Sequence, residues 1–76
     1  MHNKVDVLIK FGERVRDLRK ERGLSQEELA FKADLHRTYI GMIERAEKNI
    51  TLVNVEKLAN ALELSVNDLL NFNHGQ

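Results

Sequence analysis

The sequence predicts an all-α fold in which five helices form a single domain. Apolar residues recur at spacings of three and four, proline is absent, and runs of β-branched residues are short. Such spacing places apolar side chains on one face of a helix. A chain of 76 residues has room for one domain, and domains of this size bury only about 60% of the surface that the unfolded chain exposes. We therefore expect one domain over residues 1–76, small enough to favour association with a second subunit.

The first helix is predicted to run from about Val5 to Arg22. Gly23 follows directly, at a position where helices commonly end on glycine. Gly12 lies inside the helix and is expected to weaken it by up to about 1 kcal/mol relative to alanine. The apolar face of this helix consists of Phe11, Val15 and Leu18.

Two short helices joined by a tight turn are predicted next. Ser25 and Glu28 have the spacing of a capping box, in which each side chain bonds a free backbone N–H group at the start of the helix. The second helix extends from Gln26 to about Ala33, and the third from Arg37 to about Arg45. Between them, Asp34 can adopt the left-handed backbone conformation that the turn needs. This layout is typical of a helix-turn-helix.

Two further helices are predicted after a connector over residues 48–50. Thr51 is placed to cap the fourth helix, and Ser65 with Asp68 to cap the short fifth helix. We expect residues 1–4 and 71–76 to fray. The apolar side chains of these two helices are Leu52, Val55, Leu58, Ala59 and Leu62 in the fourth and Val66, Leu69 and Leu70 in the fifth.

The charge of the chain is distributed unevenly although its net charge is zero. Residues 1–22 carry seven lysines and arginines against four acids, whereas residues 49–76 carry one lysine against three acids. A protein that binds nucleic acid usually has a basic excess. A DNA-binding face must therefore be a local patch here, and non-specific affinity should be weak and sensitive to salt.

Composition argues against several other classes of function. The chain has no cysteine, which excludes disulfides, thiolate metal sites and thiol nucleophiles. The three histidines lack metal-ligand spacing, and the acids fit capping or solvated positions better than a catalytic pair. We expect no enzyme activity, metal, cofactor or small-molecule ligand. No apolar run approaches the roughly 20 residues that span a bilayer, and no secretory signal is present. We expect a soluble cytoplasmic protein without a membrane partner.

Three segments carry a resemblance to a known family. Residues 24–30, 36–41 and 43–45 resemble the helix-turn-helix domain of Cro and the phage repressors (XRE-like), which has the lambda-repressor-like fold. Within this domain, the run from Leu35 to Gly41 is similar to the controller proteins of bacterial restriction-modification systems. The resemblance covers nearly the whole chain and leaves no room for a separate effector domain.

Two positions depart from the family pattern. The sequence has Asp34 and Ala46 where family members commonly have glycine.

The resemblance also implies a structural ion pair. An arginine late in the first helix and a glutamate near the end of the third helix form this pair in the family, and Arg19 and Glu44 match them. Breaking a partly buried pair of this kind from one side can cost about 3 to 5 kcal/mol.

The resemblance implies that the third helix enters the major groove and that a dimer reads two half-sites about 34 Å apart. Arg37 is the best base reader, because a guanidinium can bond guanine O6 and N7 together. The Thr38 methyl group suits thymine, and Gly41 and Met42 are expected to point outward with them. Gln26 lies at a helix N-terminus that favours a phosphate. The full expected DNA-binding set is Gln26, His36, Arg37, Thr38, Tyr39, Met42, Lys48 and Asn49.

Some of these residues also have a structural interpretation. Tyr39 suits the core nearly as well as a phosphate contact, and Gln26 suits the capping box alone. Lys48 and Asn49 can be a plain connector.

For dimerisation, we expect apolar side chains of the connector and of the fourth and fifth helices to form the interface. They are Ile50, Leu52, Val53, Leu70 and Phe72.

These features predict a sequence-specific transcriptional regulator that binds double-stranded DNA as a homodimer on a palindromic operator, of the controller-protein kind. A phage or plasmid repressor is the alternative within the same fold. An antitoxin or other protein-interaction module, with DNA binding secondary, is an alternative of another class. No toxin-neutralising extension is visible in the sequence, which makes that alternative weaker.

Overall fold

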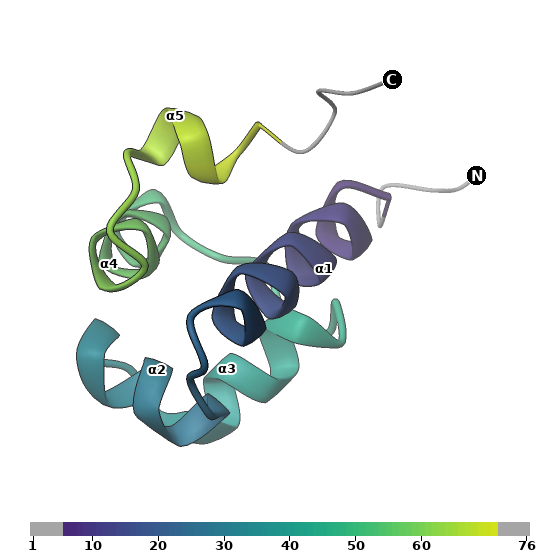
Figure 1. Cartoon of the computed structure of the whole chain (residues 1–76). Coiled ribbons are helices and arrows are strands. Elements are labelled where there is room, and N and C mark those ends of the chain that lie inside the picture. The colour runs from purple at the N-terminus through teal and green to yellow at the C-terminus, as the bar shows by residue number, and fades with distance from the viewer. Residues whose placement is uncertain (1–5, 72–76) are drawn as a thin grey trace.

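The computed structural model describes residues 6–71, which form five α-helices and no β-strand within that range (Figure 1). The predicted all-α fold is confirmed. The first and third helices end one residue earlier than expected, and Val5 lies outside the described residues. The helices are α1 (Asp6–Glu21), α2 (Gln26–Ala33), α3 (Arg37–Glu44), α4 (Leu52–Ala61) and α5 (Val66–Leu69).

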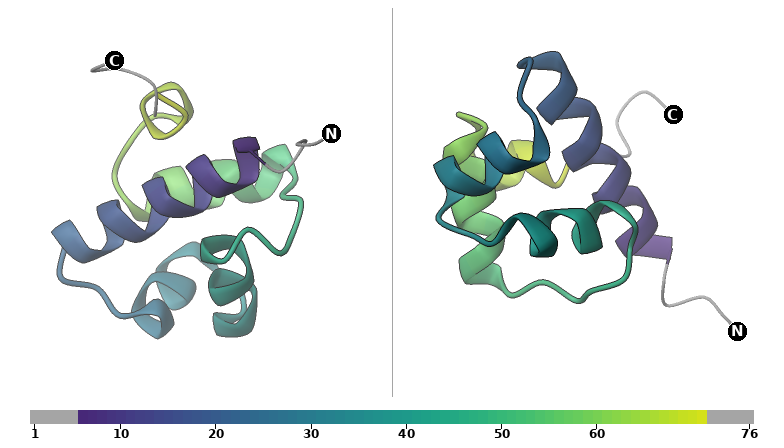
Figure 2. Two further views of the ribbon diagram at one scale, coloured as in Figure 1. Left: turned by 90° about the vertical axis from the view of Figure 1, so that its right-hand side faces the viewer. Right: turned by 90° about the horizontal axis from the view of Figure 1, so that it is seen from below.

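The five helices surround one apolar core. α3 packs against both α1 and α2, α2 also packs against α4, and α4 packs against α5. Seen from below in Figure 2, α2 and α3 lie in front of α1 and α4, so the helix-turn-helix forms one outer side of the molecule. The buried apolar side chains come from every helix and from the residue after α4. They are Phe11, Val15, Leu18, Leu29, Ala30, Ala33, Ile40, Ile43, Val55, Leu58, Ala59, Leu62 and Leu69.

The helix starts follow the capping pattern expected from the sequence. The Ser25 hydroxyl accepts the backbone N–H of Glu28 at 3.0 Å, and the Glu28 carboxylate accepts the Ser25 N–H at 2.8 Å. The Thr51 and Ser65 hydroxyls each accept a backbone N–H in the first turn of α4 and α5. At the start of α3, by contrast, His36 provides no side-chain hydrogen bond. The first turn of α3 is therefore not capped by a side chain.

Four helices end in the same way, on a residue with left-handed backbone conformation. The φ angles are 67° at Gly23, 58° at Asp34, 62° at Ala46 and 63° at Glu63. After each of them the next residue donates its N–H to a carbonyl five residues earlier, as Glu47 does to Met42 at 2.8 Å. This arrangement is the Schellman motif. The structure thus confirms the turn at Asp34 and adds Glu63, which the sequence did not indicate.

Gly12 requires a correction. The sequence predicted a small loss of helix stability at this position, but α1 crosses the C-terminal end of α3 there. A Cβ atom at Gly12 would lie 2.5 Å from the Ile43 carbonyl oxygen and 2.9 Å from the Glu44 carbonyl oxygen. Both atoms belong to backbone and cannot move aside easily. Glycine is therefore a requirement of the α1–α3 contact, which outweighs its low helix propensity.

Candidate nucleic-acid interface

The outer face of α3 is the candidate DNA-binding surface. Ile40 and Ile43 on the opposite face are buried in the core, which leaves Arg37 and Thr38 exposed at the start of the helix. His36, just before them, is exposed as well. The Arg37 side chain has no hydrogen bond or ion pair with another described residue. Its guanidinium donors are therefore open to a partner from outside.

Gly41 does not point outward as the sequence predicted. It is buried, because the side chains of Arg45 and Gln26 lie over it. A Cβ atom at Gly41 would lie 3.1 Å from Arg45 Nη1 and 3.7 Å from Gln26 Oε1. Met42, expected to be outward as well, is half-buried. The exposed residues of this segment are therefore Arg37 and Thr38 in the first turn of α3 and Arg45 just after its last residue.

Gln26 has an internal partner that the sequence did not predict. Its amide nitrogen donates to Glu44 Oε1 at 3.1 Å, so the side chain ties the start of α2 to the end of α3. The backbone N–H groups of Gln26 and Glu27 have no partner among the described residues. If this helix end holds a phosphate, these two backbone groups are the donors that remain.

The structure shows one of the two roles weighed for Tyr39. Its ring is half-buried and packs against the core, and its hydroxyl oxygen accepts the side-chain N–H of Asn54 at 3.1 Å. The phenolic proton remains to be donated. A phosphate contact by Tyr39 stays a prediction, since the hydroxyl can receive from Asn54 and donate outward at the same time.

Lys48 and Asn49 lie in the connector after α3, and both are exposed. Asn49 borders an apolar cleft of about 250 Å³ whose other walls include Val7, Ile50 and Leu70. The structure therefore places Asn49 at the edge of the surface expected to form the dimer. Lys48 does not line that cleft.

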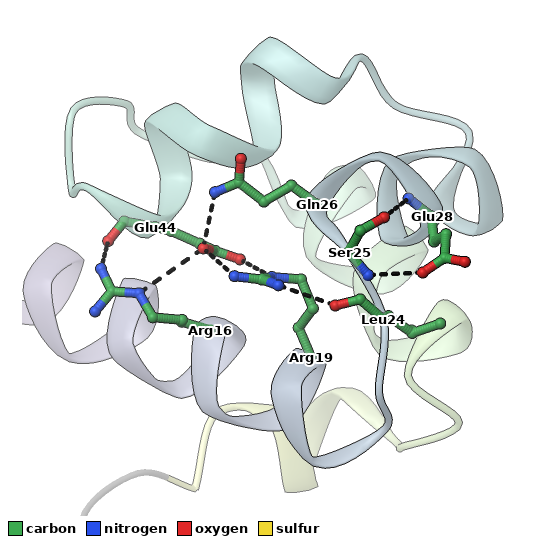
Figure 3. A network of polar contacts seen from close by, with 7 residues as sticks. All are labelled: Arg16, Arg19, Leu24, Ser25, Gln26, Glu28 and Glu44. Atoms are coloured by element: carbon green, nitrogen blue, oxygen red, sulfur yellow. Dashed lines mark hydrogen bonds and ion pairs between the residues drawn. The ribbon is translucent and has the colours of Figure 1, made fainter.

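A buried ionic network fixes the position of α3 (Figure 3). Arg19 donates to both oxygens of Glu44, from Nε at 2.7 Å and from Nη2 at 3.0 Å. Its third bond, from Nη1, reaches the Leu24 carbonyl at 2.9 Å. Arg16 Nη2 donates to the Glu44 backbone carbonyl at 3.2 Å. With the bond from Gln26, the network joins α1, α2 and α3, and the pair that the resemblance implied is at its centre.

The electrostatics of this network keep the Arg19 guanidinium charged. The Glu44 side chain is only 2% exposed and that of Arg19 11%. The hydrogen bonds to Glu44 raise the pKa of Arg19 above its already high usual value, and the attraction of the carboxylate adds to them while burial opposes both. Arg19 therefore remains charged, and the Glu44 carboxylate has a permanent partner.

Two exposed side chains near α2 and α3 were missed in the sequence. Arg45, just after α3, pairs with Glu47 at 3.1 Å, and this contact raises the pKa of Arg45 by hydrogen bonding and by charge attraction. Arg45 follows Arg37 by eight residues and Gly41 by four, and this spacing places it on the same helix face as those residues. The spacing could have identified Arg45 from the sequence. Phe31, on α2, is 88% exposed, and its helical position alone did not reveal this.

The apolar residues expected at the dimer interface are accessible. Leu52, Val53 and Leu70 are 77%, 64% and 40% exposed, and Ile50 is half-buried. Phe72 lies outside the described residues. The structure adds Val7 at the start of α1, which is 55% exposed and lines the same cleft as Leu70.

Residues 6–71 contain neither a candidate metal site nor a candidate membrane-spanning helix. No group of three or more histidine, aspartate or glutamate side chains in this range is arranged to hold a metal ion. None of the helices in the same range has the length and apolar character needed to cross a membrane.

Comparison with known proteins places this architecture in a family. A helix-turn-helix family model (HTH_3) matches residues 15–69. The chain belongs to the helix-turn-helix family. The match contains the helices from α2 to α5 entirely, and with them the Arg19–Glu44 pair. The prediction of a DNA-binding transcription regulator rather than an enzyme is confirmed at the level of this helix-turn-helix family.

Relatives within the helix-turn-helix family include several controller proteins. Control protein C.BamHI of Bacillus amyloliquefaciens is 48% identical over 73 residues, which cover 95% of this chain and 88% of that protein. The structure of the restriction-modification controller protein C.AhdI from Aeromonas hydrophila is similar with a TM-score of 0.80 and 52% identity, covering 82% of this chain and 94% of that one. The predicted resemblance to controller proteins is confirmed.

A helix-turn-helix relative has been solved together with DNA. The biofilm regulator SinR in complex with DNA is similar with a TM-score of 0.75 and 39% identity, covering 80% of this chain and 98% of that one. The similarity shows that the arrangement of helices is shared with a protein that binds DNA.

Proposed function

We propose that this protein is a controller-type transcription regulator that binds a palindromic operator as a homodimer and reads it through the first turn of α3. One observation carries the proposal: Arg37 and Thr38 are exposed at the start of a helix whose other face is buried. In a helix-turn-helix, the N-terminal residues of the second helix are those that contact base edges. Arg37 has no internal partner in the described residues, and so it is available to guanine.

The buried network supports this role of α3. Bonds from Arg19, Gln26 and Arg16 all converge on Glu44 at the end of the helix. Because a base contact requires the reading side chains to be held in a fixed position, a helix anchored at its far end by three residues is suited to it. The proposed phosphate contacts by Lys48, by Tyr39 and by the first turn of α2 would set its register on the duplex.

A phage-type repressor is the second candidate. The immunity repressor protein of Bacillus phage phi105 is 42% identical over 59 residues, but these make up only 41% of that protein. The controller proteins match over most of their length, as C.MunI of a Mycoplasma species does over 88% and C.SmaI of Serratia marcescens over 79%. We favour the controller type for this reason. A restriction endonuclease or methyltransferase gene beside this one would support it, whereas a phage gene cluster would favour the repressor.

The decisive experiment compares Arg37→Ala with Lys48→Ala. If Arg37 forms a bidentate contact with guanine, its removal should cost about 1 to 3 kcal/mol per half-site and relax discrimination at one base pair. Lys48→Ala should weaken binding to all sequences alike, and each phosphate interaction that it removes should flatten the logarithmic salt slope by about 0.9. Titrations use duplexes from the DNA upstream of the gene, with single-base changes and at several salt concentrations.

Both variants must first show normal thermal midpoints, so that impaired recognition is not confused with impaired folding. Unchanged base preferences in Arg37→Ala would contradict the proposed reading role of this residue. A wild-type protein that bound operator and unrelated duplexes equally would contradict the proposal as a whole.

A further inference from the structure

Arg45 lies on the same face of the molecule as the proposed reading residues. It follows Arg37 by eight residues and Gly41 by four, and residues four apart lie on one face of a helix. Its side chain is 56% exposed and folds back along α3, because Nη1 lies 3.1 Å from the position that a Cβ atom would take on Gly41. The absence of a side chain at Gly41 is what leaves room for it.

Glu47 holds the Arg45 guanidinium from the side. Arg45 Nε donates to Glu47 Oε2 at 3.1 Å, and Nη2 donates to Oε1 at 3.1 Å. Two residues this close in sequence meet because Ala46 has a φ of 62°, which reverses the chain. The Glu47 N–H then bonds the Met42 carbonyl at 2.8 Å. The left-handed residue at the end of α3 thus turns the carboxylate toward the arginine.

The Arg45 guanidinium contacts the Glu47 carboxylate in the arrangement in which it could also bind a phosphate. Guanidinium groups bind carboxylates and phosphates through the same two-pronged contact. The Glu47 side chain is 50% exposed, and exposed ion pairs are weak and screened by salt. A phosphate group of an approaching duplex can therefore replace the carboxylate without breaking any buried contact.

We propose, on the basis of the proposed function, that Arg45 is a further DNA-contacting residue that binds a backbone phosphate, and that Glu47 is an internal competitor for its guanidinium. A phosphate is the expected partner because eight residues of helix separate Arg45 from Arg37 by about 12 Å along the axis. The base edges are met by the N-terminal end of the reading helix. Glu47 therefore reduces the affinity for every DNA sequence and leaves base preference unchanged.

A double-mutant cycle tests this competition. The proteins are wild type, Arg45→Gln, Glu47→Gln and the double variant, with Glu13→Gln on α1 as a control for the removal of one exposed acid. Each is titrated with a duplex from the DNA upstream of the gene and with an unrelated duplex of equal length, at several salt concentrations. Thermal midpoints are compared first, and all five should agree closely because the three substituted side chains are exposed.

Glu47→Gln should tighten binding to both duplexes by about two- to fivefold per subunit, the range for an exposed pair. Arg45→Gln should weaken binding to both duplexes, and the salt slope should flatten by about 0.9 for each phosphate that the arginine no longer neutralises. In the double variant, removal of Glu47 should have no further effect, because the group for which it competes is gone. Glu13→Gln should change affinity much less than Glu47→Gln.

Three results would overturn the inference. Equal tightening by Glu47→Gln with and without Arg45 would show that Glu47 acts only by repelling DNA. Unchanged affinity in Arg45→Gln would show that Arg45 has no DNA contact, and a loss confined to the upstream duplex would assign it to a base. In each case a wild-type preference for the upstream duplex would leave the proposed function standing. The absence of that preference would contradict the proposed function itself.

Discussion

Glu44 and Glu47 are three residues apart, yet their surroundings give them opposite roles. The Glu44 side chain is 2% exposed and accepts bonds from Arg19 and Gln26. It joins three helices, and its charge is compensated at all times. The Glu47 side chain is 50% exposed and has one weakly held partner, Arg45. Burial therefore decides that the first carboxylate stabilises the fold and that the second is free to exchange its partner.

Removal of either member of the buried pair should destabilise the protein. Arg19→Ala leaves the Glu44 carboxylate buried without its main donors, and Glu44→Ala leaves the Arg19 guanidinium with the Leu24 carbonyl but without its charged partner. We expect each to lower the free energy of unfolding by about 3 to 5 kcal/mol, measured by urea or thermal unfolding. Lys20→Ala, at an exposed position of the same helix, is the control and should change it by less than about 0.5 kcal/mol. Equal, small effects in all three variants would show that the pair contributes little.

At the scale of helices, the C-terminal ends of α1 to α4 share one backbone conformation although their sequences differ. Four helices stop with a left-handed residue, but only Gly23 among these four residues is a glycine. Side chains other than glycine are strained in this conformation. The strain at Ala46 has a use in directing Glu47 toward Arg45. Glu63 has no comparable contact in the described part of the chain, so relief of its strain should stabilise the protein.

Glu63→Gly should raise the free energy of unfolding by about 0.5 to 1 kcal/mol. Removal of left-handed strain gains about 1 to 2 kcal/mol, and the greater freedom of glycine in the unfolded chain offsets about half of it. Denaturant unfolding of Glu13→Gly, at an exposed position inside α1, provides the matched control and should show a loss of about 1 kcal/mol. A loss at both positions would mean that Glu63 is not strained.

Gly12→Ala tests the contact between α1 and α3. Helix propensity alone predicts a gain of about 1 kcal/mol, but the new Cβ atom would lie 2.5 Å from the Ile43 carbonyl oxygen. We expect a net loss of about 1 to 3 kcal/mol, typical of overpacking, together with weaker DNA binding because the end of α3 is displaced. Thermal unfolding gives the first quantity and titration with DNA the second. Increased stability would show that the two helices can separate at no cost.

For the molecule as a whole, the distribution of apolar residues favours association. Val7, Leu52, Val53 and Leu70 expose large apolar side chains around the starts of α1 and α4 and the end of α5. Val7 and Leu70 meet at one cleft although they are far apart in the sequence. Leu52 and Val53 line a second hollow together with Val66. Exposed apolar residues that line clefts are typical of a protein interface. The candidate reading face on α3 carries Arg37 and Thr38 instead, so dimer contacts and DNA contacts would use different surfaces.

The protein should sediment as a dimer at micromolar concentration. Val53→Glu or Leu70→Asp should shift it toward monomer, because each places a charge in an apolar interface. Phe31→Glu introduces the same kind of charge at an exposed apolar position on α2 and should leave the dimer intact. A monomer that bound a palindromic duplex without cooperativity would contradict the proposed assembly, and dissociation by Phe31→Glu alone would move the interface to α2.

The sequence by itself determined the features that depend on near neighbours. The positions of five helices, the caps at Ser25, Thr51 and Ser65 and the turn at Asp34 were all predictable. Each rests on contacts within a few residues, or on the periodicity of apolar side chains. The Arg19–Glu44 pair was accessible only through the family resemblance, since 25 residues separate its members.

Only the tertiary structure decided which of these residues meet. Gly12 looked like a weakness until its distance to the Ile43 carbonyl was known. Gly41 was expected outside but lies beneath Arg45, and the amide of Gln26 bonds Glu44. These features depend on the packing of α1, α2 and α3 against one another, or on the path of a side chain across a helix. Neither follows from local sequence, because the same residues in isolated helices would all be exposed to water.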